Sequence, residues 1–477
     1  MNYKMVTYIL GWIMIFEAIF MAVPSITAVI YGESALWSFL ITAGICLVIG
    51  GLLTMKKRKK TTLYARDGLA IVALSWIVLS LFGALPMWMS GAIPSFVDAL
   101  FESVSGFTTT GASILSDVEA LPRSVLMWRS FTHWVGGMGV LVFIMAFLPL
   151  SGGQNMHLMR AESPGPSVSK LVPRVRTTAL LLYSIYFVLT LLEFILLLCG
   201  GMTVFEAMNT SFATAGTGGF GIYNTSMGSF SPYIQIVVTV FMLLFSINFN
   251  SYFFILVGKL KEAFSLEVKV FVFVVIVSVT IITANITSMF DSVGEALRHS
   301  AFTVGSVIST TGFSTADFDL WPELSKAILV MLMFIGACAG STGGGIKVSR
   351  IVILIKGMAK ELEMAVHPRE VKKIKMDGHI VEHETVRAVN VYVAAFVLVY
   401  AVSILVLSFD DHSFTTNFTA VAATINNIGP GLELVGPTCN FGFFSVPSKL
   451  VLIFDMLAGR LELFPMLILF KPSAWKK

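Results

Sequence analysis

The chain has 477 residues, of which 56% are hydrophobic and only 13% are charged. Soluble domains carry about 25% charged residues, so this composition excludes most soluble classes and favours a polytopic membrane protein. The formal net charge of +4 is small, and no nucleic-acid-binding face is evident. The four cysteines (Cys46, Cys199, Cys338 and Cys439) have no CxxC spacing, so neither a metal site nor a disulfide framework is predicted.

Ten stretches are apolar enough to cross a bilayer, which takes about 20 mostly apolar residues. The first is longer than the apolar core of a signal peptide, about 7–15 residues. We therefore predict a retained helix, interrupted by Pro24. The spans are 5–30, 35–55, 67–90, 124–150, 177–200, 232–257, 267–289, 324–357, 387–408 and 447–470.

Basic residues indicate how these spans are oriented, because lysine and arginine favour cytoplasmic loops. With ten spans, every basic cluster falls on one side, which places both termini in the cytoplasm. The clusters are 56–60, then Arg160, Lys170, Arg174 and Arg176, then Lys259, Lys261 and Lys269, then Lys356, Lys360, Arg369, Lys372, Lys373 and Lys375, and finally Lys471, Lys476 and Lys477. The opposite loops carry only Arg123, Arg129, Arg298, Lys326 and Lys449.

The loops on the outer side are acidic. They could be ordinary solvated loops, or they could form a negative vestibule that raises the local cation concentration. The sequence leaves both interpretations open. The residues are Asp98, Glu102, Asp117, Glu119, Glu206, Asp291, Glu295, Asp317, Asp319, Glu323, Asp410, Asp411 and Glu433.

Spans three to ten form four pairs, and each pair encloses a similar outer stretch. These stretches are 98–113, 206–221, 299–314 and 416–431. Without any gap, each has a glycine at its fourteenth position, namely Gly111, Gly219, Gly312 and Gly429. A regular spacing of this kind indicates a fourfold internal repeat.

Each repeated stretch is too short to span the bilayer. Irregular backbone survives at membrane depth only when it lines a water-filled cavity or is buried in protein. Four such turns around an axis could offer rings of backbone carbonyls that replace the hydration shell of an ion. Glycine suits these turns because it tolerates positive φ, and neighbouring side chains such as Thr109, Thr310, Asn426 and Asn427 could hold them. Alternatively, any single turn could be a re-entrant loop that only packs.

Six motifs in order carry a family resemblance. They are TTTGAS, TGGFG, STTGFS, NNIGPGLE, GACAGSTGGGIKVSRI at 336–351 and AGRLELFP at 458–465. Together they resemble the TrkH-type subunits of the Trk/Ktr/HKT superfamily of potassium transporters, over the whole chain. The two extra N-terminal spans resemble the TrkH branch rather than the shorter Ktr branch.

The resemblance implies an all-α polytopic membrane protein with four pseudo-symmetric helix–pore-loop–helix repeats around a central pore. Two transmembrane helices (1–60) would precede repeats at 61–176, 177–262, 263–375 and 376–477. It further implies a homodimer in the lipid of the plasma membrane, a cytoplasmic ring of RCK-type nucleotide-binding subunits, and K⁺ as the transported ion with no organic cofactor. The basic loops at 160–176 and 356–375 could dock that ring, or could reflect orientation bias alone.

The resemblance also implies the site residues. The filter would be Thr109, Thr110 and Gly111; Thr217, Gly218 and Gly219; Thr310, Thr311 and Gly312; and Asn427, Ile428 and Gly429. In the superfamily, serine in place of the first-repeat glycine accompanies sodium permeation, so Gly111 favours potassium. The extra Gly216 in the second repeat makes the choice of Gly219 depend on matching TGGF with TTGF.

Span eight contains the run Gly340, Ser341, Thr342, Gly343, Gly344 and Gly345. Each glycine costs roughly 1 kcal/mol in a helix interior, so the helix should break there. The resemblance implies an intramembrane gating loop, whereas the alternative is a glycine-rich packing face. Arg460, in the middle of the last span, would either face the ion pathway under this loop or pair with Asp455, and Lys347 is weighed similarly.

Two other function classes compete with a potassium pore. A secondary transporter of another solute, for example a sodium-coupled one, also uses broken helices, but it predicts inverted repeats, whereas these are parallel. A membrane enzyme would need a catalytic constellation, and the sequence offers none. The GxGxxG match at 216–221 lacks a preceding strand, and GSTGGGIK lacks the Gly-Lys-Ser/Thr of a phosphate-binding loop, so neither predicts nucleotide binding.

Overall fold

The computed structural model describes residues 1–55, 64–139, 175–369 and 372–475. The basic residues 56–60, Arg160, Lys170, Arg174, Lys476 and Lys477, and the end of predicted span four, lie outside these ranges. The described chain is almost entirely helical. Its one sheet there is a two-stranded antiparallel hairpin, β1 (Lys375–Met376) with β2 (His379–Ile380).

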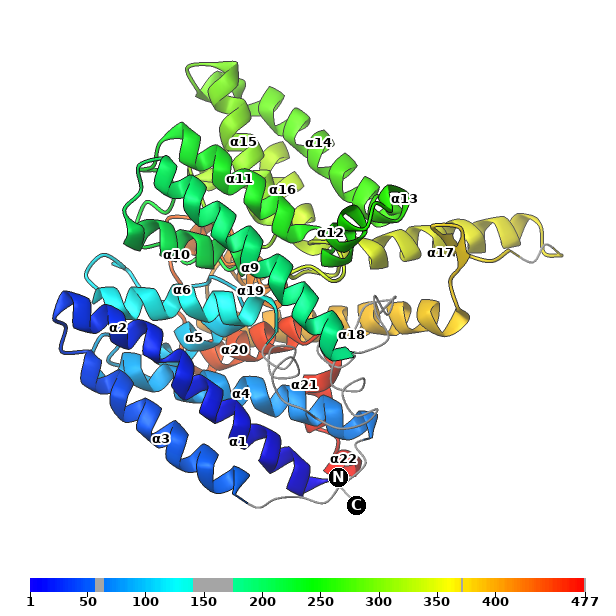
Figure 1. The fold of residues 1–477 in the computed structure, drawn as a ribbon. Coiled ribbons are helices and arrows are strands. Elements are labelled where there is room, and N and C mark those ends of the chain that lie inside the picture. The colour runs from blue at the N-terminus through cyan, green and yellow to red at the C-terminus, as the bar shows by residue number, and fades with distance from the viewer. Residues whose placement is uncertain (56–63, 140–174, 370–371, 476–477) are drawn as a thin grey trace.

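The chain begins with a pair of helices that pack side by side (Figure 1). The first is α1 (Tyr3–Phe20) continued by α2 (Ala22–Tyr31), and the second is α3 (Leu36–Thr54). The predicted interruption near Pro24 is confirmed, because α1 ends before it and proline occupies the first turn of α2, where it is tolerated. A side chain at Gly50 would collide with the carbonyl oxygen of Gly11, so these glycines let the helices approach closely.

Four units of similar architecture follow. Each has a long first helix, a shorter second helix and a third helix, which we call the inner helix. The units are α4 (Ala65–Met89), α5 (Phe96–Phe107) and α6 (Arg123–Gly137); α9 (Val175–Cys199), α10 (Val204–Ala215) and α11 (Pro232–Ser246); α14 (Leu266–Ile286), α15 (Val293–Ile308) and α16 (Glu323–Ile335); and α18 (His383–Leu407), α19 (Phe414–Ile425) and α20 (Val446–Arg460). Nearly every residue of α5 from Ala99 onward is buried, so this short helix lies inside the protein rather than on its surface. The described helices confirm the polytopic helical fold.

Smaller elements complete the described chain. They are α12 (Phe249–Leu256), α13 (Leu260–Ala263), α17 (Val348–Val366), α21 (Phe464–Leu469), α22 (Pro472–Trp475) and four 3₁₀ turns at Thr287–Met289, Phe318–Leu320, Ser408–Asp410 and Glu433–Val435.

The inner helix of each unit is shorter than the sequence predicted. Six helices of the described chain are long and apolar enough to span a membrane; they are α1–α2, α3, α4, α9, α14 and α18. Of the other four predicted spans, three are broken: α11 and α12 meet at 91°, a loop separates α16 from α17, and α20 stops at Arg460. The end of the fourth, span four, lies outside the described residues. Among these spans, we expected a break only in span eight. Spans six and ten as continuous helices were therefore wrong.

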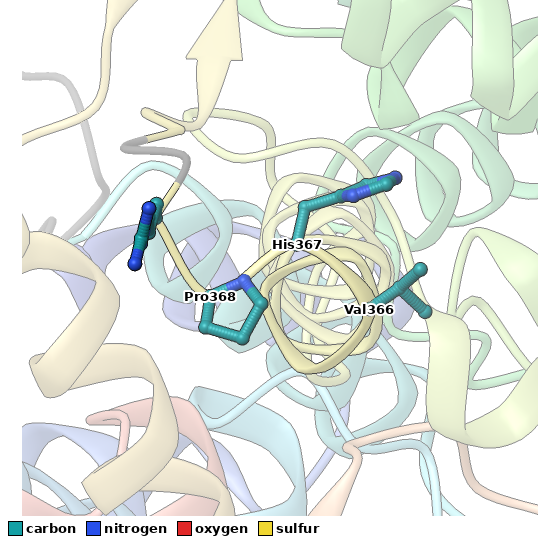
Figure 2. Close-up of a pocket in the computed structure, with 4 residues that line it drawn as sticks. Val366, His367 and Pro368 are labelled. Atoms are coloured by element: carbon teal, nitrogen blue, oxygen red, sulfur yellow. The ribbon is translucent and has the colours of Figure 1, made fainter.

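Both chain ends lie at the same end of the protein (Figure 1). The hydroxyl of Tyr3 donates a hydrogen bond to the carbonyl oxygen of Trp475 at 2.6 Å. At this end α17 and α18 project beyond the other helices (Figure 1). The tip of α17 carries a shallow pocket lined by Val366, His367, Pro368 and Arg369 (Figure 2), which includes none of the predicted site residues.

Candidate functional site: four pore loops and an intramembrane loop

The four short helices share one design. Each begins at a serine or threonine whose side chain accepts the backbone N–H three residues later: Ser95, Thr203, Ser292 and Ser413. This cap fixes where each helix starts. Since the carbonyl end of a helix carries partial negative charge, a cation is favoured where the four helices end.

The turn after each short helix has the same conformation in all four units. The first residue of the turn is left-handed, with φ between 54° and 59°, although none of the four is glycine. The next residue donates its N–H to the carbonyl five positions earlier, at 2.8–2.9 Å. The left-handed residues are Thr109, Thr217, Thr310 and Asn427, and the donors are Thr110, Gly218, Thr311 and Ile428.

The glycines that follow form a closed ring. All four have positive φ, and a Cβ on any of them would lie closer than 3.0 Å to a carbonyl oxygen of the next unit. Real Cβ atoms essentially never come that close, so each position admits only glycine without a backbone shift. The pairs run Gly111 to Gly218, Gly219 to Thr311, Gly312 to Ile428, and Gly429 to Thr110. The four carbonyls therefore belong to the residues that precede the four glycines.

A cavity of about 140 Å³ opens above this ring, and all four glycines line it. Arg129 is the only charged side chain among its lining residues in the described chain. The acidic outer residues therefore do not line this cavity. Four of the five outer basic residues instead pair with them: Lys449 with Asp98, Arg129 with Glu102, Arg298 with Glu295, and Lys326 with Glu323.

Below the ring, the glycine-rich run of span eight forms a loop between α16 and α17. Its backbone meets the turns of units three and four, where Gly344 N–H donates to Thr310 Oγ1 at 2.6 Å and Gly345 N–H donates to the Asn426 carbonyl at 3.1 Å. Thr342 Oγ1 donates to the Phe245 carbonyl at 3.1 Å. These residues are largely buried. The predicted break is confirmed, because α16 ends at Ile335 and α17 begins only at Val348. The contacts to the turns place the loop beneath the carbonyl ring.

The remaining loop residues are held at the start of the run. The Gly340 carbonyl accepts the N–H of Phe249 at 3.0 Å, and Ser341 Oγ donates to the Cys338 carbonyl at 2.6 Å. Lys347, which directly precedes α17, donates from its Nζ to the Gly343 carbonyl. Lys347 therefore holds the loop from the side of α17.

Arg460, the last residue of α20, reaches the loop from the fourth unit. One guanidinium nitrogen donates to the Thr342 carbonyl at 2.7 Å, and the other donates to the carbonyls of Gly136 and Gly137 at 2.5 and 2.7 Å. Asp455, the alternative partner considered above, accepts a hydrogen bond from Ser403. Arg460 therefore joins the loop to the end of α6.

Comparison with known proteins identifies the family. The family model described as "TrkH: Cation transport protein" matches residues 36–477. The chain belongs to the TrkH family. It is 37% identical to the Trk system potassium uptake protein TrkH of Escherichia coli K12 and 34% identical to TrkG of that organism, with at least 99% of each chain covered. The crystal structure of the potassium transporter TrkH from Vibrio parahaemolyticus matches all of both chains with a TM-score of 0.89 at 35% identity.

The second unit of this TrkH-family chain departs from units one and three. Where units one and three place paired hydroxyls, Thr108 with Thr110 and Ser309 with Thr311, unit two has Gly216 and Gly218. The imidazole of His133 fills the space, and a Cβ at Gly218 would overlap it. The extra glycines therefore make room for His133, and the conformation of Gly219 matches it with the other ring glycines.

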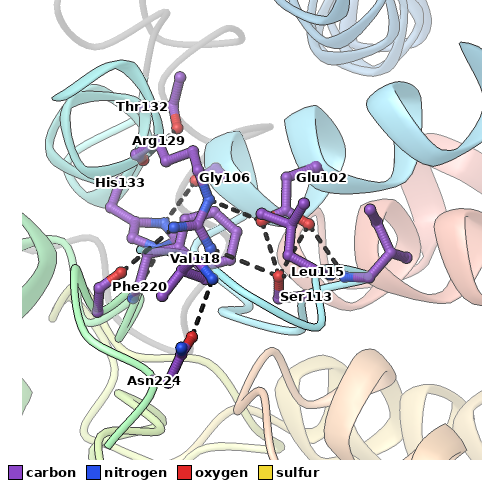
Figure 3. Close-up of polar contacts among 12 residues, drawn as sticks. Glu102, Gly106, Ser113, Leu115, Val118, Arg129, Thr132, His133, Phe220 and Asn224 are labelled. Atoms are coloured by element: carbon purple, nitrogen blue, oxygen red, sulfur yellow. Dashed lines mark hydrogen bonds and ion pairs between the residues drawn. The ribbon is translucent and has the colours of Figure 1, made fainter. Parts of the chain in front are cut away.

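His133 connects the first two units (Figure 3). Its Nε2 accepts the N–H of Phe220 at 3.3 Å, so Nδ1 carries the proton and donates to the Gly106 carbonyl at 2.7 Å. The ring is fully buried. Sequence reasoning missed this residue, because a single histidine in an apolar span carries no motif.

Arg129 and Glu102 form a buried ion pair beside the same turn (Figure 3). Arg129 Nε lies 2.7 Å from Glu102 Oε1, and Arg129 Nη1 donates to the Gly221 carbonyl at 3.2 Å. Glu102 also accepts hydrogen bonds from Ser113 and from Ile114 N–H. Both interpretations of Glu102 as an exposed outer acid were therefore wrong, because its side chain is fully buried.

Proposed function

We propose that this chain is the pore-forming subunit of a potassium uptake system. The observation that carries the proposal is the closed ring in which four glycines each face a carbonyl of the next unit. Relatives that match the whole chain are named Trk system potassium uptake proteins. Membership in a family of cation transport proteins fits conduction rather than catalysis.

In this proposal the backbone carbonyls of Thr110, Gly218, Thr311 and Ile428 replace water around K⁺. The left-handed residues before them turn the chain so that consecutive carbonyls face the axis. The short helices add the negative ends of four helix dipoles. K⁺ is the transported substrate, and the residues 109–111, 217–219, 310–312 and 427–429 form the filter.

We assign the gate to the loop Gly340–Gly345 together with Lys347 and Arg460. The loop lies under the ring, and Arg460 and Lys347 each bind one of its carbonyls. Two positive charges near a cation path raise an electrostatic barrier, and arginine's rigid donor fork favours one loop position. The proposed closed state is therefore the one with these contacts intact.

The remaining assignments follow the family. Both termini, which lie together, would be cytoplasmic, in a bacterial plasma membrane. Two chains would form a homodimer, and the basic residues of 356–375 would dock a ring of RCK-type nucleotide-binding subunits. The repeat boundaries would be 61–176, 177–262, 263–375 and 376–477.

Ion flux into proteoliposomes tests this function. The purified chain should take up K⁺ in preference to Na⁺ down an imposed gradient, with or without a proton or sodium gradient to distinguish passive from coupled transport. Protein-dependent uptake of neither ion, from vesicles in which the chain is folded and inserted, would contradict the proposal.

A further inference from the structure

Glu267 is a buried carboxylate that the proposed filter and gate do not use. It is the second residue of α14, and only 7% of its surface is exposed. Its Oε1 accepts two backbone hydrogen bonds, one from Ala339 N–H at 2.7 Å and one from Ser349 N–H at 3.0 Å. Neither donor belongs to its own helix.

The two donors stand at opposite ends of the intramembrane loop. Ala339 immediately precedes Gly340, and Ser349 is the second residue of α17. The N–H of Ser349 belongs to the first turn of that helix, where backbone donors lack helical partners. A single carboxylate oxygen therefore joins the two ends of the loop. We call this arrangement, Glu267 Oε1 with the N–H groups of Ala339 and Ser349, the clasp.

This arrangement is not an ordinary helix cap. The cap of α14 is Ser265, whose Oγ accepts the N–H of Val268. Glu267 is thereby left to serve the loop. Lys347 holds the same loop separately, by donating to the Gly343 carbonyl.

Leu266, the residue before Glu267, connects the clasp to the surface of the protein. Leu266 N–H donates to Asp377 Oδ1 at 2.7 Å. Asp377 is exposed and lies in the turn between β1 and β2, on the segment that follows the projecting helix α17. A displacement of this hairpin would pull on the first turn of α14, which holds the loop through the next residue.

We propose that Glu267 is a positioning residue that clasps the intramembrane loop and couples its position to the β1–β2 hairpin. The inference rests on the proposed function, in which this loop is the gate. It adds a mechanical route from the surface to the gate that passes through the first turn of α14.

The buried thiol of Cys338 reports on this clasp, because it precedes Ala339 directly. In the full chain with exposed Cys199 and Cys439 changed to serine, the rate of Cys338 modification by a methanethiosulfonate reagent measures loop release. Glu267→Ala should raise that rate and the basal K⁺ flux about tenfold, since hydrogen bonds to a buried charge are lost. Asp377→Ala should raise the labelling rate about threefold, because it removes one bond at the surface.

Two variants serve as controls. Glu267→Gln keeps an oxygen that can accept both N–H groups, so labelling should stay within about twofold of the parent. Glu384 is also an acid in the first turn of a long helix, α18, but it is exposed. Glu384→Ala should therefore leave both readouts at the parental level, which separates the clasp from a general effect of removing a first-turn acid.

The outcomes distinguish this inference from the proposed gate, with Arg460→Ala as the reference. Parental labelling in Glu267→Ala overturns the clasp, even if Arg460→Ala raises flux. If Glu267→Ala raises labelling, but neither Glu267→Ala nor Arg460→Ala changes the K⁺ flux, the clasp is supported and the gate is rejected. If Glu267→Ala does not fold, parental labelling in Asp377→Ala overturns the coupling.

Discussion

The outer and inner halves of this protein follow different rules. In the outer half, four turns share one cap, one left-handed residue and one glycine. In the inner half, among the residues that the structure describes, only the third unit inserts a loop beneath the ring, and this loop contacts the turns of units three and four through Thr310 and Asn426. A coordination shell gains from symmetry, whereas a barrier needs only one obstruction in the path. The comparison suggests that selectivity and gating can be altered separately.

The largest expected effect is on the symmetric half. Gly111→Ser places a side chain against the Gly218 carbonyl of the next unit and must displace backbone. We expect the K⁺ to Na⁺ flux ratio to fall about tenfold or more, because the ring loses its coordination geometry. Gly305→Ala in α15 is the control, since a Cβ there meets only ordinary contacts of 3.6 Å or longer. An unchanged ratio in a well-expressed Gly111→Ser protein would remove Gly111 from the filter.

The next effect belongs to the asymmetric half. Arg460→Ala removes donors to Thr342, Gly136 and Gly137 and should raise K⁺ flux several-fold while leaving the flux ratio unchanged. Arg460→Lys keeps the charge but loses the donor fork, so an intermediate flux would indicate that both effects contribute. Measurements on purified protein decide this. A changed flux ratio with unchanged total flux would break the separation of the two halves.

His133 packs behind the turn of the second unit, and changing it tests whether this packing maintains the ring. His133→Ala leaves Phe220 N–H and the Gly106 carbonyl without this partner and opens a cavity behind Gly218. We expect a destabilisation of about 2–4 kcal/mol and a two- to threefold fall in the flux ratio. Thermal unfolding in detergent and paired K⁺ and Na⁺ fluxes measure these changes. Full selectivity at unchanged stability would show that His133 only fills space.

The smallest effect concerns the outer loops. A hydrogen bond from Asn224 lowers the pKa of Asp117 below its ordinary value of 3.8. A depressed pKa stabilises the fold above the unfolded pKa and ceases to do so as pH falls through the folded value. Asp117→Asn should therefore lower the Tm slightly at pH 7. The difference from the parent should begin to shrink as pH falls through about 4 and should vanish only below the depressed pKa of the folded state. A difference constant with pH would contradict this origin.

The repeat and the ring glycines could be predicted because they are local features with a fixed spacing. Gly219, rather than Gly216, has the positive φ of Gly111, Gly312 and Gly429. The break in span eight was also readable, because glycines are concentrated there. The bend between α11 and α12 was not, because neither glycine nor proline marks Ile247 and Asn248.

The buried polar network could not be derived from the sequence. Glu102 and Arg129 are 27 residues apart, in segments that look like charged borders of apolar spans. Their pairing depends on how α5 packs against α6. Charge patterns reveal the side of the membrane, but they do not reveal which charges are withdrawn from water.

The ring of glycines also limits how the four units can diverge. Each glycine provides room for a carbonyl of the following unit, so a substitution in one copy harms its neighbour. The four units therefore cannot change independently at these positions. The restriction is least severe where the fourth unit meets the first, because a Cβ added at Gly429 would lie 2.9 Å from the Thr110 carbonyl oxygen, and the corresponding distances at the other three glycines are shorter. We therefore expect a small side chain at Gly429 to disturb the ring less than the same side chain at Gly219 or Gly312.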